Sequence, residues 1–273
     1  MTSHYFQKAQ EAAEFLKSRL GAAPEIAVIL GSGLSGFSKE LMDAKELQTS
    51  SIAHGLPSTV VGHSGKLFTG KIGRNSVAVL AGRVHGFEGH PPQQVVHIPR
   101  SLRLWGVKKF LITNAVGSVS PLLKPGSLAL IKDQINLTMQ SPLTGLETYG
   151  GDRFPDQSNL YDRDWRKRAI AIGKKLKMNL KECVYAGVPG PAYETAAEIH
   201  MIRRLGGDIV GMSTVWEATA LHQMGAKILG LSCITNLCTG VSKQPLSHSE
   251  VIETTAFAQK AFTKLVRAFL EMN

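Results

Sequence analysis

The chain has 273 residues, 43% of them hydrophobic, and a formal net charge of +10 at pH 7. A chain of this length and apolar content can bury a full hydrophobic core. No run approaches the ~18 consecutive apolar residues of a membrane helix, and Met1–Phe6 include no apolar signal core. These features argue against a membrane span and against secretion, so we expect a cytoplasmic protein.

The positive charge raises the question of a nucleic-acid partner. The basic residues are spread over predicted helices, however, among them Arg166–Arg168, Lys174–Lys175 and Arg203–Arg204. Dispersed cations of this kind are typical of solvated helix faces, so we expect no nucleic-acid binding. The sign of the charge is compatible with a small anionic substrate such as phosphate.

The three cysteines, Cys183, Cys233 and Cys238, form an odd set without the spacing of a metal site. Two of them lie inside apolar runs that read as strands. The pattern favours reduced, mostly buried thiols in a cytosolic protein. The alternative hypothesis is that one of these cysteines is catalytic.

The first elements along the chain have clear patterns. An apolar stripe over 5–20 predicts an amphipathic helix, and Ile26–Leu30 reads as a strand buried on both faces. Residues 66–72 and 76–81 predict a hairpin. Further strands are expected near 109–113, 127–131, 183–188, 208–211 and 227–233, and helices near 93–105, 162–177, 195–205, 214–224 and 247–271.

The alternation of strands and helices predicts an α/β fold with a mainly parallel or mixed central sheet flanked by helices. The chain shows no repeat, linker or low-complexity segment, so we expect a single domain over residues 1–273. Residues 133–160 lack periodicity and are rich in Gly, Pro and Asp. A loop of that length is usually functional, as a lid or an intersubunit arm.

A glycine-rich turn, Gly31–Gly36, follows the first strand, and its backbone amides can surround an anion. The Gly-x-Gly-x-x-Gly spacing also matches a dinucleotide fingerprint, which predicts an acidic residue closing a second strand about 20 residues on. Positions 47–56 hold no carboxylate, and Glu46 lies outside any strand-like run. We favour a phosphate-binding loop that uses the Ser32 hydroxyl, and a nicotinamide-dependent dehydrogenase is the weaker alternative.

Polar side chains follow several of the predicted strands. Arg83 and His85 come after an apolar run and, two residues apart in an extended segment, point to the same side. An arginine fork and an imidazole can together hold one anion. His63 is a weaker candidate nearby. Ser213 precedes a predicted helix, where a hydroxyl suits phosphate or merely caps the helix.

A second group of strand-end residues suits a heterocycle. Tyr193 and Glu194 lie on a strand-to-helix turn that ends in a predicted capping box at Thr195, and an aromatic ring beside a carboxylate can stack on a base and accept its ring N–H. Asn236 presents a donor and an acceptor to a nucleobase edge. His248 begins the last predicted helix.

These segments together resemble the trimeric purine nucleoside phosphorylases over nearly the whole chain. The resemblance is carried by Gly31-Ser32-Gly33-Leu34, Gly82-Arg83-Val84-His85-x-x-Glu88-Gly89, Thr113-Asn114-Ala115, Gly151-Asp152-Arg153-Phe154-Pro155, Gly190-Pro191-Ala192-Tyr193-Glu194-Thr195, Gly211-Met212-Ser213-Thr214 and Ile234-Thr235-Asn236. It implies a phosphorylase/hydrolase-like fold and a homotrimer whose sites lie near subunit contacts.

The resemblance also implies a role for each site residue. Phosphate is expected to contact Ser32, Arg83, His85, Ser213 and the backbone of Ala115. The purine is expected among Tyr193, Glu194, Met212, Thr235 and Asn236. The ribose is expected to meet Phe87, Met212, His248 at its 5′-hydroxyl, and Phe154 from a neighbouring subunit. His85, Asn236 and Glu194 are the residues expected to serve catalysis.

The implied reaction is reversible phosphorolysis of 6-oxopurine nucleosides, inosine and guanosine, in purine salvage. Phosphate is a co-substrate, and neither a metal nor an organic cofactor is expected. Asn236 can donate to N7 and O6 of the departing base, where related methylthioadenosine phosphorylases use an Asp for a 6-amino group. A non-catalytic nucleoside-binding protein is the rival of a different class, although it would not need Arg83 and His85 together.

The chain departs from the usual family pattern in three places. Phe87 stands where many members have a Tyr beside the ribose, and Trp216 replaces a common Pro. Val119-Ser120 replaces a more usual Leu-Asn. These changes leave xanthosine preference as an alternative within the same family.

Overall fold

The computed structural model describes residues 4–60, 64–145, 149–242 and 248–272. Its strands are β1 (Ile26–Leu30), β2 (Met42–Gln48), β3 (Lys66–Ile72), β4 (Asn75–Ala81), β5 (Lys109–Ser118), β6 (Leu128–Asn136), β7 (Lys181–Gly187), β8 (Ile209–Gly211) and β9 (Lys227–Leu237). Its α-helices are α1 (His4–Leu20), α2 (Pro92–Val95), α3 (His97–Trp105), α4 (Arg163–Lys175), α5 (Ala196–Arg204), α6 (Val215–Gln223) and α7 (His248–Glu271). Short 3₁₀ turns cover Ser35–Glu40, Thr49–Ser51 and Gly86–Glu88.

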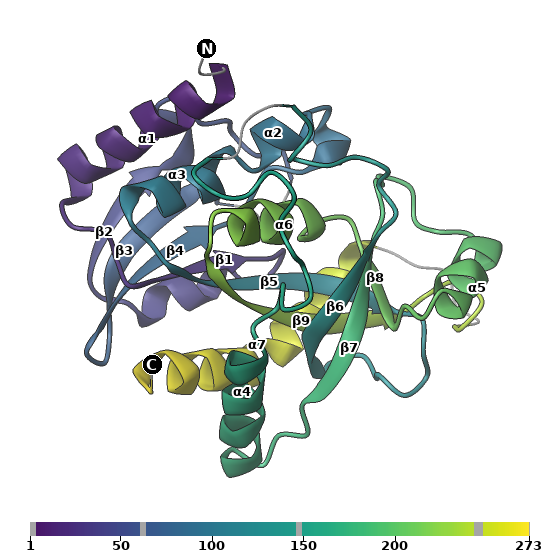
Figure 1. The fold of residues 1–273 in the computed structure, drawn as a ribbon. Coiled ribbons are helices and arrows are strands. Elements are labelled where there is room, and N and C mark those ends of the chain that lie inside the picture. The colour runs from purple at the N-terminus through teal and green to yellow at the C-terminus, as the bar shows by residue number, and fades with distance from the viewer. Residues whose placement is uncertain (1–3, 61–63, 146–148, 243–247, 273) are drawn as a thin grey trace.

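All of these strands belong to one mixed sheet in the order β2-β3-β4-β1-β5-β8-β7-β6-β9, and β5 pairs with β9 as well (Figure 1). Strands β1, β4, β5 and β9 are joined by parallel pairings, so their carboxyl ends share one edge. Because β5 pairs with both β8 and β9, the strands from β5 to β9 close into a ring. The mixed α/β architecture expected from the sequence is confirmed.

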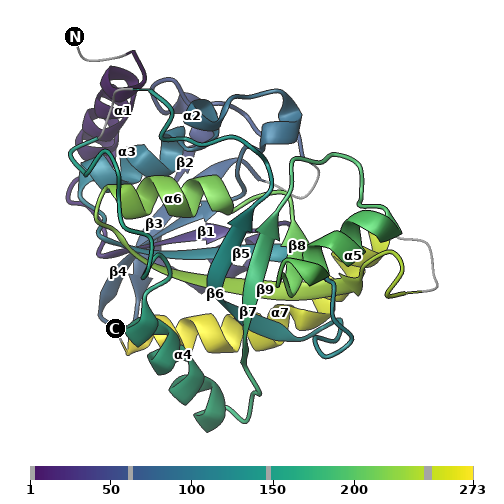
Figure 2. The ribbon, with the colours of Figure 1, turned by 45° about the vertical axis from the view of Figure 1, so that its right-hand side comes forward.

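Two layers of helices cover the sheet. Every residue of β1 is buried, and its side chains alternate between the layers, as the two-residue period of a strand requires. Ala27 and Ile29 join the core under α1, α3 and α6, whereas Val28 and Leu30 join the core under α4 and α7. Figure 2 shows the same arrangement from a second side, with α5 apart from both layers beside β8.

The expected hairpin forms as the antiparallel pair β3–β4, and α5 begins with the predicted capping box between Thr195 and Glu198. The basic residues singled out on helices lie on exposed or partly exposed positions of α4 and α5. Within the described residues, no helix combines the length and hydropathy needed to cross a membrane.

Several predicted boundaries were wrong. Strands β5, β6 and β9 extend to Ser118, Asn136 and Leu237, because their final residues continue the hydrogen-bonded ladder. The long loop therefore begins after Asn136 rather than at 133. The single helix expected over 93–105 is divided at Val96 into α2 and α3, since Pro99 has no N–H to donate one turn back.

Strand β2 was not predicted. Apart from Leu47 its residues are polar, small or exposed, and it lies at the edge of the sheet with no apolar alternation to mark it. Glu46 therefore does lie in a strand, where its carboxylate pairs with Lys66 Nζ at 2.6 Å. The glycine turn leads into a 3₁₀ turn at Ser35 rather than into the α-helix that a dinucleotide site requires.

Candidate active site

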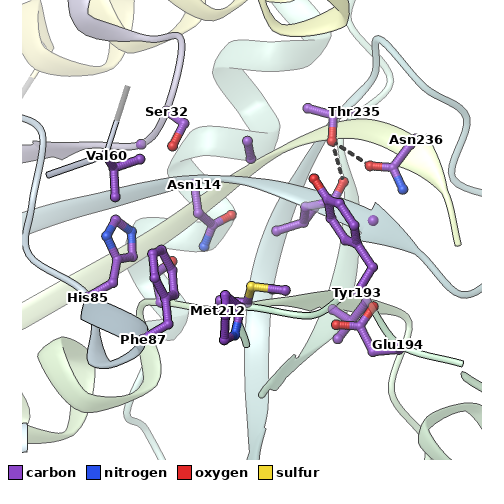
Figure 3. Close-up of a pocket in the computed structure, with 18 of the residues that line it drawn as sticks. Ser32, Val60, His85, Phe87, Asn114, Tyr193, Glu194, Met212, Thr235 and Asn236 are labelled. Carbon is purple, nitrogen blue, oxygen red and sulfur yellow. Dashed lines mark hydrogen bonds between the residues drawn. The ribbon is translucent and has the colours of Figure 1, made fainter. Parts of the chain in front are cut away.

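A cavity of about 350 Å³ opens at the shared carboxyl edge of the parallel strands (Figure 3). It is lined by Gly31, Ser32, Val60, Arg83, His85, Phe87, Asn114, Ala115, Val116, Gly117, Pro191, Tyr193, Glu194, Val210, Gly211, Met212, Ser213, Thr235, Asn236 and Cys238. Figure 3 shows His85 and Phe87 at one end, Tyr193 and Glu194 at the other, and Met212 between them. The fold thus brings together nearly all the site residues predicted from strand ends.

Arg83 lies deep at the end nearest β1 and is only 5% exposed. Its Nη2 donates to the main-chain oxygens of Ile29 at 3.2 Å and Thr113 at 2.7 Å, and its Nη1 donates to Ser213 Oγ at 3.1 Å. Its Nε lies 3.2 Å from Glu217 Oε1. The sequence suggested that the whole guanidinium fork of Arg83 faces the ligand. In the structure Nε and Nη2 contact protein oxygens, and Nη1 is the nitrogen beside the predicted phosphate residue Ser213.

The turn that carries Ser213 is strained. Thr214 has φ 73° and ψ −52°, and Val215 N donates to Ser213 O at 2.8 Å, which makes a γ-turn just before α6. For a β-branched residue this conformation costs on the order of 1–3 kcal/mol. Neither hydroxyl caps the helix; Thr214 Oγ1 instead accepts from Asn114 Nδ2 at 2.8 Å.

Tyr185, in β7, stabilises this turn by hydrogen bonds to its backbone. Its hydroxyl donates to Ser213 O at 3.0 Å and accepts from Ser213 N at 3.1 Å. The ring is fully buried in β7, and burial raises the pKa of the phenol, so the group stays neutral. Gly211 makes room for it, because a Cβ at Gly211 would come within 2.7 Å of the hydroxyl.

His85 is fixed by its neighbours on the turn after β4. Its ring stacks on Phe87, with centroids 4.7 Å apart and planes at 16°. Glu88 Oε1 accepts from His85 N at 2.7 Å and lies 3.3 Å from His85 Nδ1, while Glu88 Oε2 accepts from the backbone and hydroxyl of Thr59 at 2.6 and 2.7 Å. Burial by itself raises the pKa of Glu88, but these hydrogen bonds outweigh it and lower the pKa to about 2.

Tyr193 and Glu194 form the opposite end of the cavity, on the turn between β7 and α5. Tyr193 is 43% exposed, so one side of its ring is open to a ligand. Burial raises the pKa of the Glu194 carboxyl above its usual value, partly offset by a backbone hydrogen bond. A carboxylate that has lost part of its hydration gains more from an N–H donor than one in water.

The sequence suggested that Thr235 and Asn236 follow the end of their strand. In the structure both residues lie within β9. Thr235 Oγ1 lies 2.8 Å from Asn236 Oδ1 and 3.1 Å from Val116 O, so its one hydrogen is shared between these two acceptor oxygens (Figure 3). Because a hydroxyl donates to the amide oxygen, Asn236 keeps its NH₂ as the group to present to a ligand. Among the residues that the structure describes, its Nδ2 makes a long contact of 3.4 Å with Leu237 O.

The cysteines are free and buried, as expected. Cys238 lines the cavity, but burial raises the pKa of its thiol to about 12. Burial likewise raises the pKa of Cys233 to about 12. A thiolate nucleophile is therefore disfavoured, which argues against the alternative of a catalytic cysteine.

Three predicted residues are not seen at the cavity. Phe154 is 88% exposed and lies on the outer surface with Ser141 and Arg153. The side chain of His248, and His63 entirely, lie outside the described residues. Trp216 stands behind the site: its ring packs against Gly86, and its Nε1 donates to Thr138 Oγ1 at 2.9 Å and Gln140 O at 3.2 Å.

Sequence reasoning assigned no role to the supporting residues Glu88, Tyr185 and Glu217, although Glu88 belongs to a motif that carries the family resemblance. Glu88 stands three residues after His85, a spacing that could have suggested the carboxylate–imidazole contact. Tyr185 reads as an ordinary core aromatic in an apolar strand. Glu217 reads as a first-turn helix acid, and only the fold shows that it points inward to Arg83.

Comparisons with known proteins agree with this geometry. The phosphorylase superfamily model matches residues 25–271. A purine nucleoside phosphorylase 1 of Geobacillus stearothermophilus is 40% identical over 262 residues, which cover 96% of each chain. The purine nucleoside phosphorylase of Bos taurus is 36% identical over 269 residues, covering 96% of this chain and 93% of the bovine one.

The solved structures include a Schistosoma mansoni purine nucleoside phosphorylase in complex with adenosine. It aligns with a TM-score of 0.90 and 31% identity, over 97% of this chain and 96% of its own. The family model spans residues 25–271, a range that includes every residue lining the cavity. The chain therefore belongs to the phosphorylase superfamily and, within it, to the purine nucleoside phosphorylases.

Proposed function

We propose that this protein catalyses the reversible phosphorolysis of 6-oxopurine ribo- and deoxyribonucleosides such as inosine and guanosine, releasing the base and α-(deoxy)ribose 1-phosphate in purine salvage. One observation carries the proposal: Arg83, His85, Glu194 and Asn236 line a single cavity, with His85 at one end and Glu194 and Asn236 at the other (Figure 3). The first pair suits an oxyanion, and the second suits the edge of a purine. The relatives named above are purine nucleoside phosphorylases, which supports the assignment.

Phosphate is proposed to lie among the hydroxyls of Ser32 and Ser213, the imidazole of His85, the backbone N–H of Ala115 and the Nη1 edge of Arg83. All of these groups line the same cavity. Because the site offers hydrogen-bond donors and one fixed guanidinium, it can hold a dianion and point one oxygen at the sugar. The negative charge of the bound phosphate balances the cationic character that the ribose gains as the bond breaks.

The base is proposed to stack on Tyr193 beside Met212. Glu194 accepts from N1–H and, in guanosine, from the 2-amino group. Asn236 donates to N7 and O6, with its amide oriented by Thr235, whose hydroxyl contacts Asn236 Oδ1 at 2.8 Å. Negative charge builds on the purine as it leaves, so the donation strengthens in the transition state and lowers the barrier.

The reaction balances without a metal or an organic cofactor. A phosphate oxygen forms a bond to C1′ from the face opposite the base while the C1′–N9 bond breaks. The bonding electron pair passes into the purine ring, which takes up a proton. Inversion at C1′ converts the β-nucleoside into an α-sugar phosphate, and the reverse reaction follows the same path.

The ribose is proposed to lie between the two ends, against Phe87 and Met212, with His248 at its 5′-hydroxyl. Phe154 is exposed on the outer surface, which suits a residue that completes the ribose site of a neighbouring subunit in a homotrimer. The cytoplasm is the proposed location, in keeping with three free cysteines.

The test is phosphate-dependent release of free base from inosine, guanosine, xanthosine and adenosine, followed by chromatography. Inosine and guanosine are expected to be cleaved much faster than adenosine, and only with phosphate present. Adenosine belongs in the panel because the Schistosoma mansoni relative was solved with it. Equal cleavage of adenosine and inosine would overturn the specificity; binding without cleavage would favour a nucleoside-binding protein, and fastest cleavage of xanthosine the xanthosine-preferring alternative.

A further inference from the structure

Glu217 lies in the first turn of α6, behind the end of the cavity where Arg83 stands. Its side chain is 2% exposed, and its Oε1 is 3.2 Å from Arg83 Nε. Neither of its oxygens has a hydrogen-bond partner among the residues that the structure describes. A carboxylate so deeply buried is costly unless a cation lies beside it, so the contact with Arg83 compensates the burial of both charges.

The guanidinium of Arg83 is held along two edges. Glu217 faces Nε, and the main-chain oxygens of Ile29 and Thr113 accept from Nη2. The group is planar and rigid, so these contacts fix where Nη1 lies. Nη1 is the nitrogen that contacts Ser213 Oγ.

Glu217 does not itself line the main cavity. It borders two small cavities of about 20 Å³ each, which Arg83 separates from the main one by lining all three. The walls of these two cavities include Val84, Val95 and Trp216 together with polar residues such as Gln94 and Thr138. Because Glu217 contacts Arg83 and does not line the main cavity, it acts on a ligand there through the arginine.

We propose that Glu217 is a positioning residue that sets the orientation of Arg83 toward phosphate. The inference rests on the proposed role of Arg83 as a phosphate ligand. Glu217 also offsets the positive charge of Arg83. It therefore weakens the electrostatic attraction of the site for a dianion, while it fixes the orientation of the guanidinium. Orientation and charge can be separated experimentally, because glutamine keeps the acceptor oxygen and loses the charge.

The experiment compares Glu217→Gln with Glu217→Met. The two side chains have similar volumes and no charge, but only Gln offers an oxygen to Arg83 Nε. In Glu217→Met we expect the KM for phosphate to rise at least about tenfold, while the KM for inosine changes little. A small misplacement of a binding group such as the Arg83 guanidinium can cost up to ~10²-fold. In Glu217→Gln the KM for phosphate is expected to equal or fall below that of the parent.

Phosphate binding is also measured without turnover, as the rise in melting temperature at increasing phosphate concentration. Thr219→Val serves as the matched control, since Thr219 is buried on the same helix and accepts from Gln134 Nε2 at 3.1 Å, away from Arg83. This variant is expected to lose stability without a change in the KM for phosphate. Both Glu217 variants behaving alike toward phosphate would overturn the proposal.

Arg83→Lys separates this inference from the proposed phosphate site. If Arg83→Lys leaves the KM for phosphate unchanged, the assignment of Arg83 is wrong. If Arg83→Lys raises that KM while Glu217→Met does not, only the role of Glu217 is overturned. If Glu217→Met does not fold, Glu217→Gln still decides the matter, because a raised KM for phosphate in that variant contradicts the orientation argument.

Discussion

The indole of Trp216 lies so close to Gly86 that a Cβ on Gly86 would come within 2.7 Å of the indole Cη2. Gly86 stands between His85 and Phe87, so the tryptophan supports the turn that carries both cavity residues. The indole Nε1 also donates to Thr138 Oγ1. Trp216, which departs from the usual family pattern, thus links the site to the segment after β6.

Trp216→Ala is expected to lower the free energy of unfolding by about 3–5 kcal/mol, as the loss of a buried large aromatic does, and to raise the KM for nucleoside and for phosphate. Trp216→Phe keeps a ring against Gly86 and should cost about 0.5–1.5 kcal/mol from the lost hydrogen bonds, with smaller kinetic effects. Urea unfolding and steady-state kinetics measure both.

Trp105→Phe is the matched control for this prediction. Trp105 is as buried as Trp216, at 9% exposure, and its Nε1 donates to Gly21 O at 3.0 Å, away from the cavity. Its substitution should lower stability alone. If Trp105→Phe and Trp216→Ala changed the KM values to the same extent, the support of the His85 turn by Trp216 would be refuted.

Tyr185→Phe is expected to raise the KM for phosphate, because the lost hydroxyl both donates to and accepts from the Ser213 backbone. The partly buried Ser213 N–H would lose that partner, at a cost of about 1 kcal/mol in the free energy of unfolding. Tyr161→Phe is the control: this tyrosine is also buried and donates to Gln134 Oε1 at 2.7 Å, outside the cavity. Unchanged phosphate kinetics in Tyr185→Phe would contradict the prediction.

Most of the cavity could be predicted from the sequence because its residues follow apolar runs at one edge of a parallel sheet. Arg83 and Ser213 stand at such positions, and the strand pattern alone brings their segments together. The supporting residues could not be predicted in this way. Tyr185 and Glu217 act through contacts between distant parts of the chain, and the pattern of their own elements does not mark those contacts.

The edge strand β2 was missed for a related reason. Its polar residues satisfy the hydrogen-bonding pattern of the sheet without burying an apolar face, so hydrophobic alternation is absent where the backbone is nevertheless paired. The extension of β6 to Asn136 is a similar case, because backbone pairing continues past the point at which burial ends. The extension of β5 to Ser118 differs, because Ser118 is buried and only its polar type hides the strand.

Glu88→Gln is expected to reduce stability at neutral pH and to flatten the acid side of the stability profile. The pKa of Glu88 is lowered from 4.5 to about 2 in the folded protein. Because the folded value lies below the unfolded one, its contribution is fully present above pH 4.5 and is lost as the pH falls toward 2. Urea unfolding of parent and variant over acidic pH should give a difference that shrinks in that range; a constant difference would contradict this origin.

Glu194 should make nucleoside binding sensitive to mild acid. Burial raises the pKa of Glu194 above 4.5, and the protonated carboxyl is a poor acceptor for the purine N1–H. The kcat/KM for guanosine should therefore fall as the pH drops toward the raised pKa, with the loss mainly in KM. Glu194→Gln should bind guanosine weakly at every pH and lack this acid limb; a variant that kept the limb would place its origin in another group.

Asn236→Asp is expected to shift the preference from inosine toward adenosine. Thr235 donates to Oδ1 of Asn236, which leaves the amide nitrogen to donate to N7 and the 6-oxo group. An ionised aspartate accepts instead of donating, so it repels O6 and suits a 6-amino group. The kcat for inosine should fall by about 10²–10³, the usual effect of removing a transition-state donor.

Thr235→Val tests the orientation of the Asn236 amide separately. This variant frees the amide to turn, so it should weaken the cleavage of inosine without improving the cleavage of adenosine. Parallel assays with both nucleosides measure the ratio, and an unchanged preference in Asn236→Asp would show that another residue reads the 6-position.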